Sequence, residues 1–189
     1  MMQALNGSIV ALITPMHENG EVDFESLSNL VEWHIQEGTA GIVSMGTTGE
    51  SATLSVSEHL SVIEKTIKFV NGRIPVIAGS GSNSTAQAIE TTSESKNLGA
   101  DYCLLVTPYY NRPSQKGLID HYFKIADSVQ IPQILYNVPS RTACDLLPKT
   151  VEILAEHQNI IGIKESVSDE NRINDLIKIS NTANEKFLV

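Results

Sequence analysis

Short apolar runs alternate with longer helical patterns along the chain, and this alternation limits the possible folds more than any other feature. The apolar runs occupy residues 8–14, 41–45, 74–79, 102–107, 132–137 and 160–164, and a last one, KFLV, begins at residue 186. Most are continuously apolar, which is typical of strands covered on both faces in parallel sheets. Strand and helix repeat with a period of roughly 30 residues, so the sequence predicts a parallel α/β fold.

The helical segments carry recognisable start and stop signals. Residues 23–38 (DFESLSNLVEWHIQEG) show an apolar stripe that ends at Gly38. Ser55 and Glu58 have the spacing of a capping box at the start of the next helix. Ser84 and Gln87 form a second possible box, after a GSGSNS segment that could instead cradle a phosphate.

Two architectures fit this repeat, a doubly wound open sheet and a (β/α)8 barrel. No GxGxxG follows the first apolar run, which weighs against a dinucleotide-binding sheet. Six βα units and the start of a seventh strand are visible in 189 residues, whereas a complete barrel takes about 250 residues. If the fold is a barrel, we expect residues 1–189 to form the N-terminal part of a single barrel domain.

Composition narrows the function classes. The chain is 41% hydrophobic and 19% charged, as expected for a globular domain. Its net charge of -9 argues against nucleic acid or an anionic membrane as a partner. The N-terminus lacks the features of a signal peptide, and no apolar stretch reaches the ~20 residues that span a bilayer. We therefore expect a cytoplasmic location.

The metal-binding residue types show no ligand pattern. The two cysteines, Cys103 and Cys144, belong to no CxxC motif, and the five histidines have no ligand spacing. We therefore expect no metal site.

Unusual polar residues follow several predicted strands. They lie in GTTGES (46–51), TPYYNRPSQ (107–115) and YNVPSRT (136–142), and at Lys164, which ends IIGIK. In either architecture the carboxyl ends of parallel strands meet at one edge, where ligands bind. These four segments are the candidate site.

Lys164 is the candidate nucleophile. Isoleucines precede it, and partial loss of water disfavours the ammonium form and lowers the pKa of the amine. A neutral amine can attack a ketone and form a Schiff base. The competing interpretation is a structural lysine that extends into solvent or pairs with Glu165.

The other strand-end groups each allow a functional and a structural interpretation. Thr47 and Thr48 offer hydroxyls and backbone amides to an anion, or they belong to an ordinary βα loop. Tyr136 can relay a proton, or it is a rim aromatic with its hydroxyl in water. Arg141 in the loop after VPS can clamp a carboxylate, or it is a solvated surface residue. The adjacent Tyr109 and Tyr110 are more typical of an interface than of catalysis.

Taken together, GTTGES, TPYYNRPSQ, YNVPSRT and IGIKE resemble the pyruvate-dependent class I aldolases and lyases, the family that includes N-acetylneuraminate lyase. YYNRPSQ and YNVPSRT resemble the dihydrodipicolinate synthase branch in particular, and the resemblance runs from GSIVALITPM to the last residue. It implies a (β/α)8 TIM barrel with a helical C-terminal extension, assembled as a homotetramer of two tight dimers. On this resemblance, we expect the last barrel strands and that extension to be missing from residues 1–189.

The resemblance also implies a reaction in lysine (diaminopimelate) biosynthesis. Pyruvate would form an imine with Lys164, and the derived enamine would attack L-aspartate-4-semialdehyde to give 4-hydroxy-tetrahydrodipicolinate. No metal or organic cofactor is implied. Thr47 and Thr48 would hold the pyruvate carboxylate, with Thr47 also in a proton relay. Tyr136 would be the central acid/base, and Arg141 would bind the carboxylate of the semialdehyde. Tyr110 would complete the relay from the neighbouring subunit.

Relatives of this kind are often inhibited by L-lysine bound between subunits. The positions that would match such a site are Ser51, Ala52, His59, Asn83, Gln87 and Tyr109. Val56 and Gln87 depart from the lysine-sensitive pattern, which has a histidine and a glutamate there. A neutral glutamine cannot pair with the amine of lysine, so we expect weak or absent inhibition.

Two other functions remain open from the sequence. The first is a sister pyruvate aldolase that acts on a sugar acid such as N-acetylneuraminate. The second is an inactive chain that only assembles with other subunits or misfolds, because an unclosed parallel barrel exposes strand edges and apolar surface.

Overall fold

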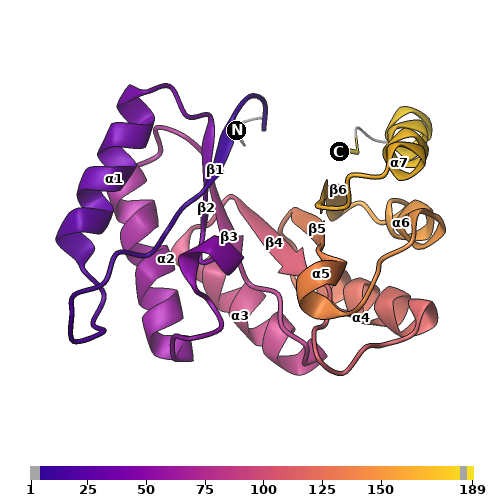
Figure 1. The fold of residues 1–189 in the computed structure, drawn as a ribbon, viewed down its shortest axis with the longest axis horizontal. Helices are drawn as coiled ribbons and strands as arrows, with labels where there is room; N and C mark the ends of the chain where they lie inside the picture. The colour runs from indigo at the N-terminus through magenta and orange to yellow at the C-terminus, as the bar shows by residue number, and fades with distance from the viewer. Residues whose placement is uncertain (1–4, 184–186) are drawn as a thin grey trace. The chain divides into compact units, whose positions relative to one another are not determined.

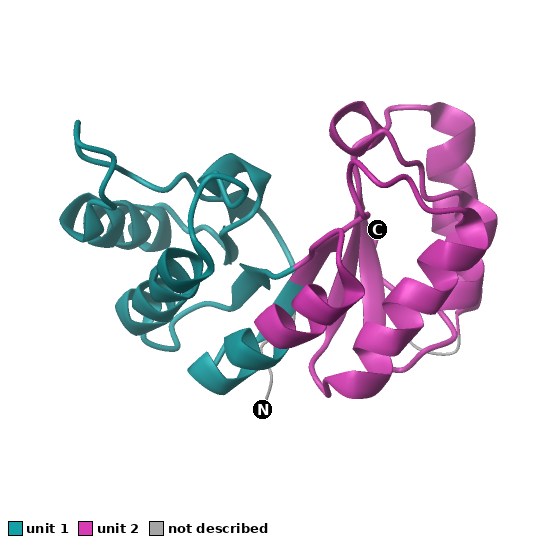
Figure 2. Ribbon diagram, turned by 90° about the horizontal axis from the view of Figure 1, so that it is seen from below, with its two compact units in different colours: residues 1–80, 93–103 teal, residues 81–92, 104–189 magenta. Residues whose placement is uncertain are grey.

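The computed structural model of this protein describes residues 5–183 and 187–189. The chain divides into two compact units, which Figure 2 colours separately. Unit 1 comprises residues 1–80 and 93–103, and unit 2 comprises residues 81–92 and 104–189. Helix α3 (Thr85–Leu98) and strand β4 (Tyr102–Val106) contribute residues to both units. The expectation of a single barrel domain stays a prediction.

Unit 1 is built on three strands in sequence order, β1 (Ile9–Ala11), β2 (Gly41–Ser44) and β3 (Val76–Gly79). β1 pairs with β2 and β2 with β3, both in parallel. The predicted strand over residues 8–14 is therefore shorter than expected. The backbone amide of Leu12 still donates to the carbonyl of Val43 in β2. The Thr14 hydroxyl, in contrast, donates to the carbonyl of Gly49 at 2.7 Å.

Two helices cover this sheet, and Figure 1 shows them side by side, α1 (Phe24–Gln36) and α2 (Val56–Val70). The Asp23 carboxylate accepts from the Ser26 amide and begins α1, and Gly38, at φ +78°, follows its end. The predicted capping box of α2 is confirmed, because Ser55 and Glu58 make both reciprocal bonds.

Unit 2 carries β5 (Gln133–Asn137) and β6 (Ile160–Glu165), which pair in parallel. Leu188 forms a parallel bridge with Gly162, and its backbone bonds to Ile161 and Ile163 on both sides. The predicted start of a seventh strand is thus confirmed at Leu188, whereas Lys186 lies outside the described residues.

In the described part of unit 2, four helices lie wholly within the unit: α4 (Gln115–Ser128), the single-turn α5 (Pro139–Thr142), α6 (Pro148–Leu154) and α7 (Glu170–Thr182). They enclose one continuous core with the strands, whose fully buried members include Leu105, Tyr122, Leu135, Leu154 and Leu176. Each such leucine contributes about 2 kcal/mol through lost water contact. α4 packs on α6, and α6 on α7.

The second possible capping box is only half formed. The Ser84 hydroxyl accepts from the Gln87 amide at 3.4 Å, which confirms Ser84 at the start of α3. The Gln87 side chain, however, donates to Thr91 within the same helix. Within the described residues, no helix is long and apolar enough to cross a membrane.

Gly79, at the end of β3, leaves no space for a side chain. A Cβ added there would lie 2.2 Å from the carbonyl oxygen of Met45. The backbones of β3 and of the segment after β2 can therefore approach closely only because this residue is glycine.

We expect Gly79→Ala to lower the free energy of unfolding by about 2–4 kcal/mol, because the backbone of Met45 must move. The matched control is Gly41→Ala in β2, where an added Cβ meets only side-chain atoms at 3.4 Å or more. Urea unfolding of both variants measures the difference. Equal stability of the two variants would contradict this explanation.

Candidate functional site at the strand ends

Lys164 and Tyr136 lie beside each other at the carboxyl ends of β6 and β5. The strand register pairs the two residues directly, and the Lys164 Nζ lies 4.5 Å from the centre of the Tyr136 ring. Tyr136 is 8% exposed, so its ring is largely buried, and the interpretation of a hydroxyl in water stays a prediction. Because the ring covers the amine, Tyr136 lies within reach of any group that forms on it.

The Lys164 amine has lost part of its water. The residue as a whole is exposed, yet the protein atoms around its amine lower the pKa from the usual 10.5 by desolvation. The predicted direction of the shift is therefore confirmed. The proposed pairing with Glu165 is wrong, because the Glu165 carboxylate bonds instead to Asn137 and Arg172.

A largely buried polar cluster lies next to this pair, and sequence reasoning missed it. It consists of Asn137, Asp145, Glu165 and Arg172, joined by hydrogen bonds and ion pairs. The one available signal was that Asn137 and Glu165 directly follow the two site residues in their strands.

Arg141 was expected in a loop, and this was wrong. It lies in α5, a single helical turn that Pro139 begins, because proline suits the first position of a helix. The side chain is exposed, and no carboxylate among the described residues lies within ion-pair distance of it. Its guanidinium is therefore available to bind an anionic ligand.

The GTTGE segment forms a tight 3-10 turn, Thr47–Gly49, in unit 1. Thr47 and Thr48 are both exposed, so their hydroxyls are open to a ligand. The turn is held from the segment after β1, where the Thr14 hydroxyl donates to the carbonyl of Gly49. Before it, Met45 is 1% exposed and has a positive φ of 56°, which is rare for a bulky residue. Such an outlier persists only where the surroundings enforce it.

The two tyrosines after β4 differ in their surroundings. Tyr110 is 92% exposed and has a φ of 72°, whereas Tyr109 is 36% exposed. The carbonyl of Tyr109 accepts from the Asn83 side chain at 3.2 Å, and the carbonyl of Asn83 accepts from Asn111 at 3.1 Å. These reciprocal amide bonds fix the loop, and they leave the ring of Tyr110 in solvent.

The residues predicted to bind an inhibitor fall into two groups. Ser51, Ala52 and His59 belong to unit 1, where His59 Nε2 lies 2.7 Å from the carbonyl of Gly79 and burial lowers the pKa of its ring. Asn83 and Tyr109 are joined in unit 2, and Gln87 follows in α3. The grouping of all six residues stays a prediction.

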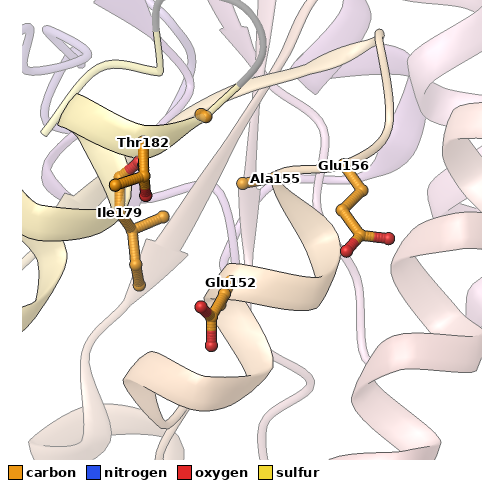
Figure 3. A pocket seen from close by; sticks show the side chains of 6 residues that line it. Glu152, Ala155, Glu156, Ile179 and Thr182 are labelled. Carbon is orange, nitrogen blue, oxygen red and sulfur yellow. The ribbon is translucent and has the colours of Figure 1, made fainter.

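A surface pocket of unit 2 lies away from these strand ends. Figure 3 shows it between α6 and α7, lined by Glu152, Ala155, Glu156, Ile179, Thr182 and Ala183. It contains none of the predicted site residues. Among the residues that the structure describes, no cluster of three His, Cys, Asp or Glu side chains could hold a metal ion.

Within each unit the parallel strands pair in the order of the sequence, without the reversal of strand order that marks a doubly wound sheet, and this arrangement is that of (β/α) barrels. A family model described as the Dihydrodipicolinate synthetase family matches residues 4–189. The chain belongs to this family.

Similar proteins agree with this membership. The chain is 59% identical over 171 residues to 4-hydroxy-tetrahydrodipicolinate synthase from Pseudomonas syringae, a match that covers 90% of this chain and 59% of the relative. It is 62% identical over 166 residues to the enzyme of the same name from Stutzerimonas stutzeri, a match that covers 88% of this chain and 57% of that relative. The chain thus spans somewhat less than 60% of the length of these relatives.

A solved structure has closely the same fold as this chain. It is dihydrodipicolinate synthase from Acinetobacter baumannii complexed with pyruvate, with a TM-score of 0.93 and 55% identity, covering 94% of this chain and 61% of that one. The predicted fold class, part of a (β/α)8 barrel, is confirmed.

We expect the Lys164 amine to react with a small acylating reagent at lower pH than an ordinary lysine, because desolvation disfavours its ammonium form. Competitive labelling of the folded chain across a pH series, read by peptide mass spectrometry, gives the midpoint for this residue. That midpoint should lie below 10.5. A midpoint at or above 10.5 would contradict the lowering of the pKa by desolvation.

Proposed function

We propose that this chain carries the imine-forming half of a Schiff-base lyase that condenses pyruvate with L-aspartate-4-semialdehyde. The observation that carries the proposal is the placement of Lys164 over the ring of Tyr136, with the pKa of its amine lowered. Relatives that bear the name of this synthase, at 59% and 62% identity, support the choice of reaction.

The first chemical step uses the neutral form of Lys164. Its nitrogen lone pair attacks the ketone carbon of pyruvate, and the resulting carbinolamine loses water to give an imine. Loss of a proton from the pyruvate methyl group gives an enamine, whose carbon attacks the aldehyde carbon of the second substrate. The amino group of that substrate then displaces Lys164 as the ring closes, which frees the lysine for another cycle.

Each step moves protons close to Tyr136. Its hydroxyl can protonate the departing oxygen of the carbinolamine and can take up a proton in the reverse sense. Thr47 relays protons to this tyrosine in our proposal, and Tyr110 completes the relay from a second subunit. The exposed ring of Tyr110 on a fixed loop supports such a role.

Two further groups bind the charged ends of the substrates. Thr47 and Thr48 hold the pyruvate carboxylate through hydroxyls and backbone amides, as their exposure in a tight turn allows. Arg141 holds the carboxylate of the semialdehyde, because a guanidinium can bind a carboxylate with two parallel bonds.

The remaining parts of the proposal concern cofactor and context. The covalent imine on Lys164 takes the place of an organic cofactor or metal. We further propose a homotetramer of two dimers in the cytoplasm, working in lysine (diaminopimelate) biosynthesis. The exposed Tyr109 and Tyr110 support an interface on this loop.

We expect borohydride to trap a reduced pyruvyl adduct on Lys164 and not on other lysines. Lys164→Arg should abolish the adduct, because a guanidinium stays protonated and cannot attack a ketone. Lys149→Arg is the matched control, since Lys149 is an exposed lysine on α6 of the same unit. Peptide mass mapping after incubation with pyruvate measures the result.

Failure to trap an adduct on a folded chain would reject the proposal for this chain. A cooperative melt by circular dichroism establishes that the chain is folded. An adduct that reacts onward with a sugar-derived aldehyde, and not with the semialdehyde, would point to the sister aldolase.

We also expect L-lysine to inhibit weakly or not at all, because Gln87 offers no charge to its amine. Gln87→Glu should increase the affinity for L-lysine, and Glu90→Gln, on the exposed face of the same helix, is the control. Isothermal titration with L-lysine measures binding directly. Strong binding to the unchanged chain would contradict this expectation.

A further inference from the structure

The largely buried cluster behind the candidate site, defined above as Asn137, Asp145, Glu165 and Arg172, joins the ends of β5 and β6; only the Asp145 side chain, at 38%, is substantially exposed. The Asn137 amide nitrogen donates to both carboxylate oxygens of Glu165, at 3.1 and 3.0 Å. It also lies 2.9 Å from an oxygen of Asp145, and the Asn137 carbonyl oxygen accepts from the Leu146 amide. The Asn137 side chain therefore has partners on both of its polar atoms.

Arg172 closes the cluster from α7. The Asp169 carboxylate accepts from the Arg172 amide and so fixes this residue in the first turn of the helix. The guanidinium bonds to Asp145 at 2.5 Å, to Glu165 at 3.2 Å and to the carbonyl of Leu146 at 3.0 Å. The Glu165 side chain is 5% exposed and that of Arg172 is 12% exposed. Buried charges of this kind persist only when they are paired and hydrogen-bonded.

The cluster and the candidate site lie on opposite faces of the same two strands. Successive side chains in a strand point to opposite faces, so the pair Tyr136–Lys164 and the next pair, Asn137–Glu165, face in opposite directions. The bonds between Asn137 and Glu165 hold the two strand ends in one register. A slip by one residue would turn Lys164 away from Tyr136.

The bonds of Glu165 to Asn137 and Arg172 also fix the position of the carboxylate that follows Lys164 in the strand. Glu165 directly follows Lys164, and its charge is matched by Arg172 on the far face. Without that partner, the charge of the Glu165 carboxylate would act unbalanced on the neighbouring amine and favour its ammonium form. An amine held as ammonium has no lone pair with which to attack a ketone.

We propose that Asn137 and Arg172 are positioning residues for imine formation: through Glu165 they hold Lys164 opposite Tyr136 and balance the charge of the carboxylate that follows the amine in the strand. This proposal rests on the proposed function for its chemistry, although the geometry that it describes does not.

The test compares Arg172→Lys with Arg73→Lys. Lysine keeps the charge and the fold, but a single ammonium cannot bridge two carboxylates and a carbonyl. Arg73 is the matched control, because its guanidinium also bonds to a carboxylate, that of Glu32, and to the carbonyls of Phe69 and Val70, in unit 1. Asn137→Leu is a second variant of similar size that removes the amide.

Two measurements are made on each variant after a melt has shown that it is folded. The first is the rate of borohydride-trapped adduct formation as a function of pyruvate concentration. We expect Arg172→Lys and Asn137→Leu to lower the saturating rate about tenfold, as a misplaced reacting group does, with little change in the half-saturating concentration. The second is the acylation midpoint of Lys164, which should rise toward 10.5 in both variants. Arg73→Lys should change neither measurement.

The results separate the two proposals. If the unchanged chain forms an adduct and the variants form it at the same saturating rate, the positioning role is overturned. If the unchanged chain forms no adduct, the proposed function fails, and the acylation midpoint alone decides the positioning role. A midpoint that rises in the variants of the cluster supports the role, and one that stays the same overturns it.

Discussion

The register between β5 and β6 is the constraint on which the candidate site depends. Pairing begins with Gln133 opposite Ile160 and then shifts by one residue, so that Ile134 lies opposite Gly162. The extra residue, Ile161, uses its carbonyl to bond Leu188. Without this irregularity Tyr136 would lie opposite Ile163, and Lys164 would have no aromatic neighbour in the adjacent strand. A register irregularity at the start of the two strands therefore determines which side chains lie side by side at their ends.

Close backbone contacts hold the remaining loops. Gly81 approaches the amide of Val106 so closely that an added Cβ would lie 2.4 Å from its nitrogen. Gly79 lies similarly close to the carbonyl oxygen of Met45. The amide side chains of Asn83 and Asn111 add hydrogen bonds between the loop after β3 and the loop after β4. These contacts do not involve the exposed side chains of Thr47, Thr48, Tyr110 and Arg141, which remain accessible to ligands. Rigid anchors and accessible side chains thus alternate along the same loops.

Local features were predictable from the sequence, and long-range pairings were not. Continuous apolar runs predicted the parallel strands, and the spacing of Ser55 and Glu58 predicted a complete cap, because both depend on neighbouring residues alone. Lys164 was predicted with a lowered pKa, but the partner of Glu165 was not, since Arg172 reaches it from a separate helix. The single turn at Arg141 was missed because helix propensity is weak evidence over four residues.

The two faces of β5 and β6 connect the candidate lysine with residues on the far side of the strands. If our proposal holds, Tyr136 and Lys164 act only together with the Asn137–Glu165 pair behind them and the helix that supplies Arg172. Grafting an imine-forming lysine onto another parallel sheet would therefore require five residues from three elements. Searches for unrecognised sites of this kind can look for the hidden amide–carboxylate pair as well as for the lysine.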